Sequence, residues 1–170
     1  MRSRIAGLAL AVALSGASGA GCGGSAEDGV SRDAQMYVAA IREVLAVQPP
    51  PPEPDVLPVV FVVGVGETKI PAEVQAEVAV ELDDDADIRF ADARDEAILE
   101  DQEHAPVRDE GVLLAVGELP GGDDEQMDTA LVDVEVYRSD QDSSSVVLTI
   151  ARRSSHWAVT SSSVLGTAES

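Results

Sequence analysis

Two runs of alternating apolar and polar residues constrain the fold of this 170-residue chain more than any other feature. In residues 130–138 valines alternate with acidic residues, and in residues 146–152 apolar residues again occupy every second position. Because side chains alternate between the two faces of a strand, each run predicts a strand with one buried face. With a polar hairpin loop at 139–145, a turn at 153–155 and a last strand at 156–163, these runs predict an antiparallel meander.

The first half of the chain predicts two helices separated by a buried strand. Apolar residues recur every three to four positions after Ser31, a favourable N-cap, and the prolines of residues 49–54 end this helix. Residues 57–63 form a continuous β-branched and aromatic run, which is typical of a strand buried on both faces. Residues 71–82 fit a strand as well as a helix; we favour a helix, because Pro71 suits a first turn and alanine and glutamate are good helix formers.

The order of these elements predicts the fold class. Shorter strands are expected at residues 88–91 and 112–116, and one helical turn at residues 96–99. Helices in the first half and paired strands in the second predict an α+β fold, in which an N-terminal helix and a second helix pack on a mainly antiparallel sheet. We expect a single domain over residues 31–165, with the proline-rich linker 49–54 inside it and a tail at residues 166–170.

The only cysteine, Cys22, follows a segment with the features of a secretory signal peptide. Arg2 and Arg4 precede an apolar run at residues 5–14, and small residues lead from there to Cys22. The apolar run is shorter than the ~20 residues that a membrane-spanning helix needs. Residues 19–22, Gly-Ala-Gly-Cys, resemble a bacterial lipobox, which implies cleavage before Cys22 and a lipid on its thiol.

The lipobox resemblance implies where the protein is located. Residues 1–21 would be the signal peptide, residues 22–30 a small, polar tether, and the lipid on Cys22 would hold the protein at the outer face of the cytoplasmic membrane. The alternative is ordinary signal-peptidase cleavage after a small residue such as Ala20, because Gly19 stands where the lipobox usually has leucine. That cleavage would release a secreted soluble protein.

Two further resemblances concern the outline of residues 31–165 and the chain as a whole. An N-terminal helix followed by a meander whose last strand carries Trp157-Ala158-Val159 resembles cystatin-like and NTF2-like α+β domains. Such folds often form a cone with an apolar pocket, so the resemblance implies a shape and not an activity. The chain is also similar to small uncharacterised lipoproteins of actinobacteria, which implies a location in the cell envelope.

The formal net charge of −21 limits the partners that the chain can have. So acidic a surface repels nucleic-acid phosphates and anionic lipid headgroups, so we expect no nucleic-acid partner. The charge favours solubility and can attract cations or a basic partner, such as another envelope protein. Apart from Cys22 the chain has no thiol, which excludes a disulfide, thiolate catalysis and a cysteine-based zinc site in the domain.

Two motifs resemble ligand-binding loops without completing them. Gly64-Val65-Gly66 follows a predicted strand, as in a dinucleotide fingerprint, but Lys69 occupies the position of the third glycine. We interpret the glycines as a turn. Asp83, Asp85 and Asp87 have the spacing of a calcium loop, but an EF-hand needs Gly and Glu at the positions of Ile88 and Arg94. Other acidic clusters are Asp123-Asp124-Glu125 and Asp140 with Asp142. Weak calcium binding is one interpretation of these clusters, and solvated acidic turns are the one we favour.

The remaining candidates are histidines, a basic cluster and a tyrosine. His104 and His156 lie too far apart in sequence for a local metal site. The basic cluster Arg152, Arg153 and His156 adjoins Trp157. It predicts either an anion or sugar contact on which the tryptophan stacks, or a hairpin end with Trp157 in the core, which we favour. If the cone fold holds, Tyr37 could serve a pocket, although a tyrosine on an apolar helix stripe is more often core.

These observations predict no catalytic, cofactor-binding or metal-binding residue, and one modified residue, Cys22. We expect no cofactor. The first hypothesis is a non-enzymatic, membrane-anchored binding or interaction module of the cell envelope. The alternatives are a small-ligand carrier or enzyme with an apolar pocket between helix and sheet, and a weak calcium-binding surface protein.

Overall fold

The computed structural model describes residues 30–47, 56–66, 68–120 and 127–169. The predicted signal peptide, all but the last residue of the tether, and the proline-rich linker lie outside these ranges. The described residues form helices α1 (Arg32–Val47) and α2 (Ala72–Glu81) and single 3-10 turns η1 (Arg94–Glu96) and η2 (Arg108–Glu110). Their strands are β1 (Val59–Gly64), β2 (Asp87–Phe90), β3 (Val112–Val116), β4 (Thr129–Ser139), β5 (Asp142–Arg153) and β6 (His156–Glu169).

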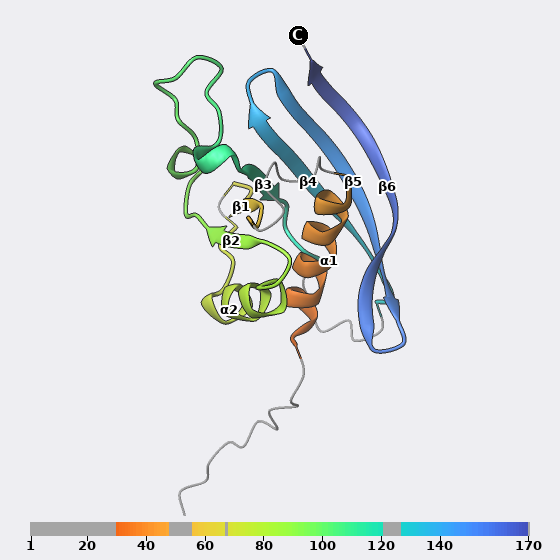
Figure 1. Cartoon of the computed structure of the whole chain (residues 1–170). Helices are drawn as coiled ribbons and strands as arrows, with labels where there is room; N and C mark the ends of the chain where they lie inside the picture. The colour runs from red at the N-terminus through yellow and green to blue at the C-terminus, as the bar shows by residue number, and fades with distance from the viewer. Residues whose placement is uncertain (1–29, 48–55, 67, 121–126, 170) are drawn as a thin grey trace, which may run out of the picture.

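All six strands belong to one mixed sheet in the order β2-β1-β3-β4-β5-β6 (Figure 1). β1 pairs in parallel with β2 and β3, and the pairs from β3 to β6 are antiparallel. The crossover between the parallel strands β1 and β2 contains α2, as such connections usually do. The predicted α+β fold, with two helices on a sheet that ends in a C-terminal meander, is confirmed.

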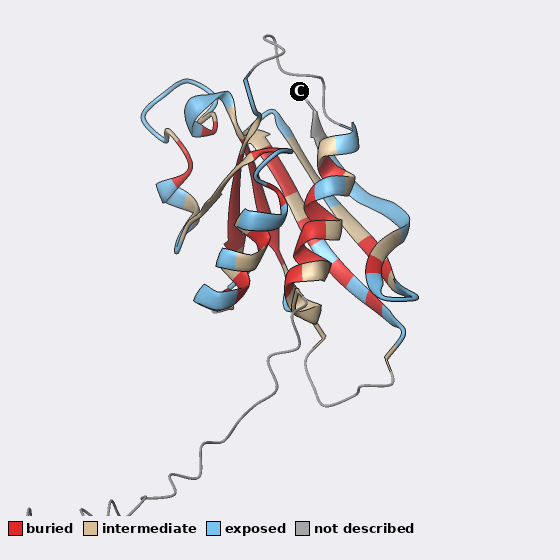
Figure 2. Ribbon diagram, turned by 60° about the horizontal axis from the view of Figure 1, so that its bottom comes forward, coloured by how far each residue is buried: buried red, intermediate tan, exposed pale blue. Residues whose placement is uncertain are grey.

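Both helices pack on the same face of the sheet. The larger apolar core joins α1 and α2 to side chains of β1, β3, β4 and β5, and includes Trp157 at the start of β6. Buried positions follow the sheet-facing sides of the helices and the central strands (Figure 2). On the opposite face, a smaller core forms where Ile98 and Val107 cover β1, β3 and β4. No helix among the described residues is long and apolar enough to cross a membrane.

Ser31 links the start of α1 to α2. Its Oγ accepts the N–H of Ala34 at 3.4 Å, which confirms the predicted N-cap. The same hydroxyl donates to Glu77 Oε2 of α2, and the Ser31 backbone N–H donates to that oxygen at 2.8 Å. The hydroxyl first, and the backbone N–H second, lower the pKa of the Glu77 carboxyl from its ordinary value. One residue therefore caps α1 and positions it against α2.

The meander differs from the prediction at two places. The hairpin loop expected at 139–145 is wrong: β4 ends at Ser139 and β5 begins at Asp142, and Ser139 Oγ accepts the Asp142 N–H at 3.1 Å. The serines of residues 143–145 lie in β5, because pairing with strands on both sides outweighs their polar character. The tail expected at 166–170 is likewise wrong over residues 166–169, which pair with the start of β5.

Two predictions for segments that precede β3 have different outcomes: the first is confirmed and the second is wrong. The ambiguous segment 71–82 is helical, as α2 shows, because its Val74 and Val78 side chains are buried on one side of a helix. The helical turn expected at 96–99 lies earlier, at η1. Ile98 instead forms an isolated antiparallel bridge with Val107, because the segment folds back over the second face of the sheet.

Candidate functional site

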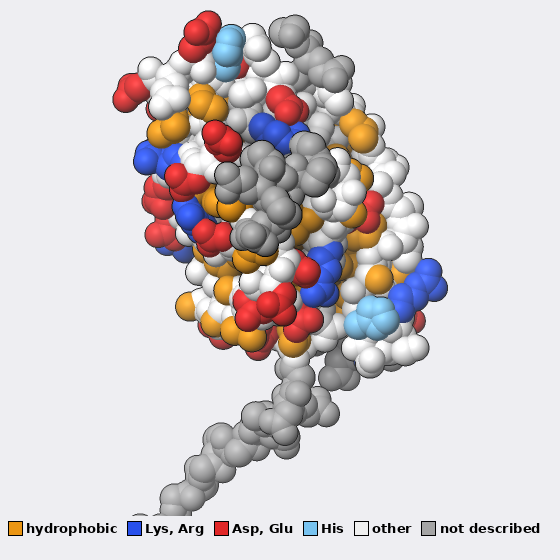
Figure 3. Space-filling model, in the orientation of Figure 1, with side chains coloured by type: hydrophobic (Ala, Val, Ile, Leu, Met, Phe, Trp, Pro, Cys, Tyr) orange, Lys and Arg blue, Asp and Glu red, His pale blue; other side chains and the backbone are white. Residues whose placement is uncertain are grey.

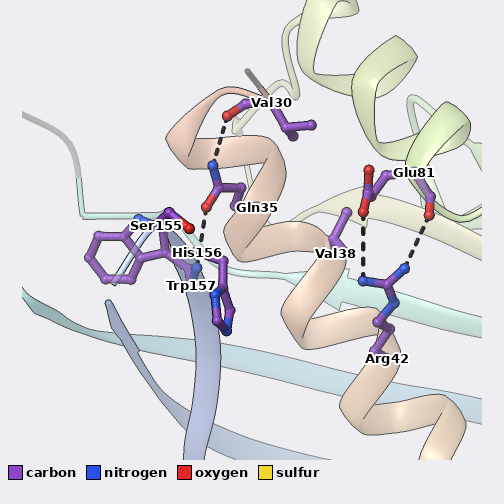
Figure 4. A pocket seen from close by; sticks show the side chains of 8 residues that line it. All are labelled: Val30, Gln35, Val38, Arg42, Glu81, Ser155, His156 and Trp157. Atoms are coloured by element: carbon purple, nitrogen blue, oxygen red, sulfur yellow. Dashed lines mark hydrogen bonds and ion pairs between the residues drawn. The ribbon is translucent and has the colours of Figure 1, made fainter. Parts of the chain in front are cut away.

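An open groove of about 380 Å³ lies where α1, the end of α2 and the start of β6 meet (Figure 4). It continues along α1 into a second hollow of about 300 Å³, and Val38, Arg42, His156 and Trp157 line both. The first hollow is completed by Val30, Gln35, Glu81 and Ser155, and the second by Ala39, Glu43, Ala158 and Val159. We call this surface the α1–β6 groove.

Gln35 fixes the floor of the α1–β6 groove. Its side-chain Oε1 accepts the backbone N–H of Trp157 at 3.2 Å, and its Nε2 donates to the Val30 carbonyl at 2.8 Å (Figure 4). The amide therefore holds the first residues of β6 against the N-terminal half of α1. Together the two bonds tie the start of β6 to the start of α1 and so hold these two sides of the groove in place.

Trp157 forms one wall of the groove and belongs to the main core. It is only 9% exposed and packs with the buried residues of the helices and central strands. The Arg32 guanidinium lies 5.6 Å from its ring centroid and donates to the Pro120 carbonyl at 2.8 Å. The interpretation of Trp157 as a core residue is confirmed, and an exposed stacking platform is not formed.

Charged side chains surround the opening of the groove. Arg42 Nε lies 3.0 Å from Asp85 Oδ2, and Arg42 Nη2 donates to the Glu81 carbonyl at 3.2 Å. A guanidinium at the C-terminal end of α2 is favourable, because free carbonyls and the helix dipole make that end negative. His156 is exposed on the opposite side of the groove. The groove thus combines an apolar floor with a charged rim.

The other members of the basic cluster lie outside the groove. Arg152 and Arg153 are exposed at the end of β5 and line neither hollow. Neither forms an ion pair with another residue in the described ranges, so the expected neutralisation of nearby carboxylates is not seen there. His156 alone of this cluster contributes to the candidate site.

The two histidines stay apart and serve different surfaces. His104 belongs to the segment that folds over the second face of the sheet, and its Nδ1 lies 3.4 Å from Asp140 Oδ1. His156 begins β6 beside the helices. The structure therefore places the two histidines on different surfaces of the domain.

Three carboxylates of the acidic clusters, Asp85, Asp87 and Asp142, contact arginines. Besides the Asp85–Arg42 pair, Asp87 Oδ2 lies 2.7 Å from Arg89 Nη2, and Asp142 Oδ1 lies 3.2 Å from Arg138 Nη1. Within the described ranges, no group of three or more Asp, Glu, His or Cys side chains is arranged to hold a metal ion. The cluster at residues 123–125 lies outside those ranges.

Tyr37 belongs to the core and not to the groove. It is 3% exposed, and burial, with the nearby charge of Asp33 as the smaller cause, raises its pKa to about 12. The turn interpretation of Gly64-Val65-Gly66 is also confirmed, because Gly64 ends β1 and a β-carbon on it would lie 2.1 Å from the Thr68 carbonyl oxygen.

Sequence reasoning missed the α1 residues that build the groove. Gln35 and Arg42 lie seven positions apart, so they occupy the same side of α1 as two polar residues flanking the buried Val38. That spacing is the only signal of these two α1 residues in the sequence, and it is equally typical of a solvated helix face. The decisive partners, Glu81 and Trp157, come from distant parts of the chain.

No family model matches the chain, and the comparisons with curated proteins and with solved structures found no match either. The likeness to cystatin-like and NTF2-like domains and to actinobacterial lipoproteins therefore stays a prediction. What the structure establishes is an α+β domain of two helices on a six-stranded mixed sheet, with an open groove beside its first helix.

Proposed function

We propose that this chain is an exported, lipid-anchored binding module of the cell envelope, and that its α1–β6 groove receives an extended segment of a partner protein. The observation that carries this proposal is the groove itself: two adjoining hollows along α1 with an apolar floor and a charged rim. Binding sites that combine apolar contact with a few placed polar groups have this character. The anchor would be the lipid on Cys22.

The charge of the chain supports a basic partner. The net charge is −21, and removal of residues 1–21 takes away Arg2 and Arg4, which leaves the mature chain still more acidic. Such a field raises the association rate of a positively charged partner and repels acidic ones. Glu43 and Glu81 on the rim would contact basic side chains, while Val38 and Ala39 would contact apolar ones.

A small-ligand carrier is the second candidate, and the size of the groove favours it. A volume of about 380 Å³ falls within the roughly 300–1,000 Å³ of small-molecule sites. The groove lies between the two helices and the edge of the sheet, not between one helix and the sheet. The carrier hypothesis differs from the first in predicting a bound small molecule and no protein partner.

A photo-crosslinking amino acid at Ala39 tests the binding module in intact cells. Ala39 lines the groove, whereas Asp101, the matched control, is exposed on the segment that covers the opposite face of the sheet. We expect a discrete crosslinked protein from position 39 and none from position 101. Equal products from both positions, or no product from position 39, would contradict a partner in the groove. A small molecule retained in native mass spectrometry would then favour the carrier.

A further inference from the structure

Strand β6 is a long sheet edge without two features that commonly protect such edges, short length and charged side chains along the strand. It ends the sheet, extends over His156–Glu169 and carries no charged residue from 158 to 168. Residues 160–167 are exposed, with Val164 64% and Leu165 68% exposed. An exposed edge of this kind presents unpaired N–H and C=O groups to any strand that can pair with it. We propose that two copies of this chain associate by antiparallel pairing of their β6 strands.

β2, at the opposite edge of the same sheet, has two features that protect an edge strand from pairing with another chain. β2 has four residues, and its Arg89 forms ion pairs with Asp87 and with Asp109 from η2. Short length and charged side chains are two common ways to prevent an edge from pairing. β6 is long and carries no charged residue from 158 to 168, so the two edges of the sheet differ in their capacity to accept another strand.

Among the described residues, only the start of β6, next to the turn that follows β5, has an outward backbone N–H bonded to another element. The Arg152 N–H donates to the Asp128 carbonyl, on the β4 side of β5. Trp157, which pairs with Arg152 in β6, therefore directs its own N–H away from β5 and toward the edge of the sheet. Gln35 of α1 accepts this outward N–H. Beyond Val159, no described side chain outside β6 accepts an N–H of this strand, so the edge is open from there onward.

The outward positions of β6 are symmetric about Ser163. Register shifts leave one extra residue in β6 at Thr160 and another at Leu165. Alternation from Trp157 across these shifts turns the backbone N–H groups of six residues toward the open edge: Trp157, Val159, Ser162, Val164, Thr167 and Glu169. A two-fold axis at Ser163 places Ser162 opposite the partner's Val164, and Val159 opposite the partner's Thr167. Both strands then offer bonding groups at the same places, which is what an isologous antiparallel pair requires.

The distribution of charge favours a second copy of the chain, paired in the antiparallel orientation, as the partner of β6. Strongly acidic chains repel one another over most of their surface, but the flank formed by β6 is nearly free of acidic side chains (Figure 3). Arg152 and Arg153 lie at the end of β5 next to the start of β6, and Asp140 and Asp142 lie near its other end. Antiparallel pairing sets the basic end of one copy beside the acidic end of the other, whereas parallel pairing would set like charges together.

Sedimentation velocity of the mature protein over a wide concentration range tests the dimer. We expect the wild-type protein to form a dimer at high concentration. Ser162→Pro removes an outward N–H, a change that an edge strand tolerates, and Val164→Lys places a charge beside the two-fold axis. Both variants should stay monomeric, with unchanged circular dichroism. Val80→Lys, the same substitution on the exposed surface of α2, should dimerise like the wild type.

Two results would overturn the proposal. A wild-type protein that is monomeric at every concentration does not pair through β6 with a second copy. A dimer that persists in both Ser162→Pro and Val164→Lys, with the fold retained, uses another surface. Neither result depends on occupancy of the α1–β6 groove. The dimer and the proposed binding function are therefore tested independently of each other.

Discussion

Replacing Leu114 by alanine is expected to lower the free energy of unfolding by about 2–5 kcal/mol. Leu114 is fully buried on β3, the strand that joins the parallel and antiparallel parts of the sheet, and it faces the helices. Truncation removes apolar contacts and leaves a cavity that the surrounding strands cannot close, because β3 is held on both sides. Urea denaturation followed by far-UV circular dichroism measures the change.

Leu131→Ala is the matched control for this prediction. Leu131 lies on β4 and is 66% exposed, so the same truncation removes little buried surface. Its effect should stay within about 0.5 kcal/mol, as for most surface substitutions. If Leu114→Ala and Leu131→Ala destabilise the protein equally, the helices do not cover the face of the sheet that the structure assigns to them.

The second large effect is expected for Gly64→Ala, with a loss of about 1–3 kcal/mol. A β-carbon on Gly64 would lie 2.1 Å from the carbonyl oxygen of Thr68, an approach that only displacement of the backbone can relieve. Gly64 ends β1, so this displacement would disturb the connection into α2. The midpoint of urea unfolding should therefore fall markedly.

Gly166→Ala provides the corresponding control in a strand. No heavy atom lies within 4 Å of a β-carbon added there, and a side chain restricts the unfolded chain more than glycine does. We expect this variant to be neutral or slightly more stable, by up to about 0.5–1 kcal/mol. A Gly64→Ala protein as stable as Gly166→Ala would show that the tight turn after β1 does not form in solution.

The meander and both helices could be predicted because their signals are local. Alternation marks the two faces of β4 and β5, and Ser31 caps α1 as its position suggests. The hairpin and the end of β6 could not be placed correctly, since serines 143–145 give no strand signal and three of residues 166–169, Gly166, Ala168 and Glu169, have low intrinsic strand preference. Their pairing partners in β4 and β5 determine their conformation, and local propensity does not record such partners.

The parallel arrangement of β1 also depends on distant segments. Its continuous apolar run indicates burial on both faces, as found for Val60 to Val63, but not which strands lie beside it. The candidate groove illustrates the same limit. Gln35 and Arg42 are unremarkable polar residues of a helix until Trp157 and Glu81 are brought beside them by the fold.

The intact mass of the mature protein, recovered from its native cells beside a Cys22→Ala variant, tests the central claim most directly. An envelope module held by a lipid should appear in the membrane fraction as a chain that begins at Cys22 and carries a diacylglyceryl adduct. The variant should lose both the adduct and the membrane association, because the lipid needs the Cys22 thiol. An unmodified wild-type chain in the soluble fraction would contradict the anchored module and indicate a secreted protein.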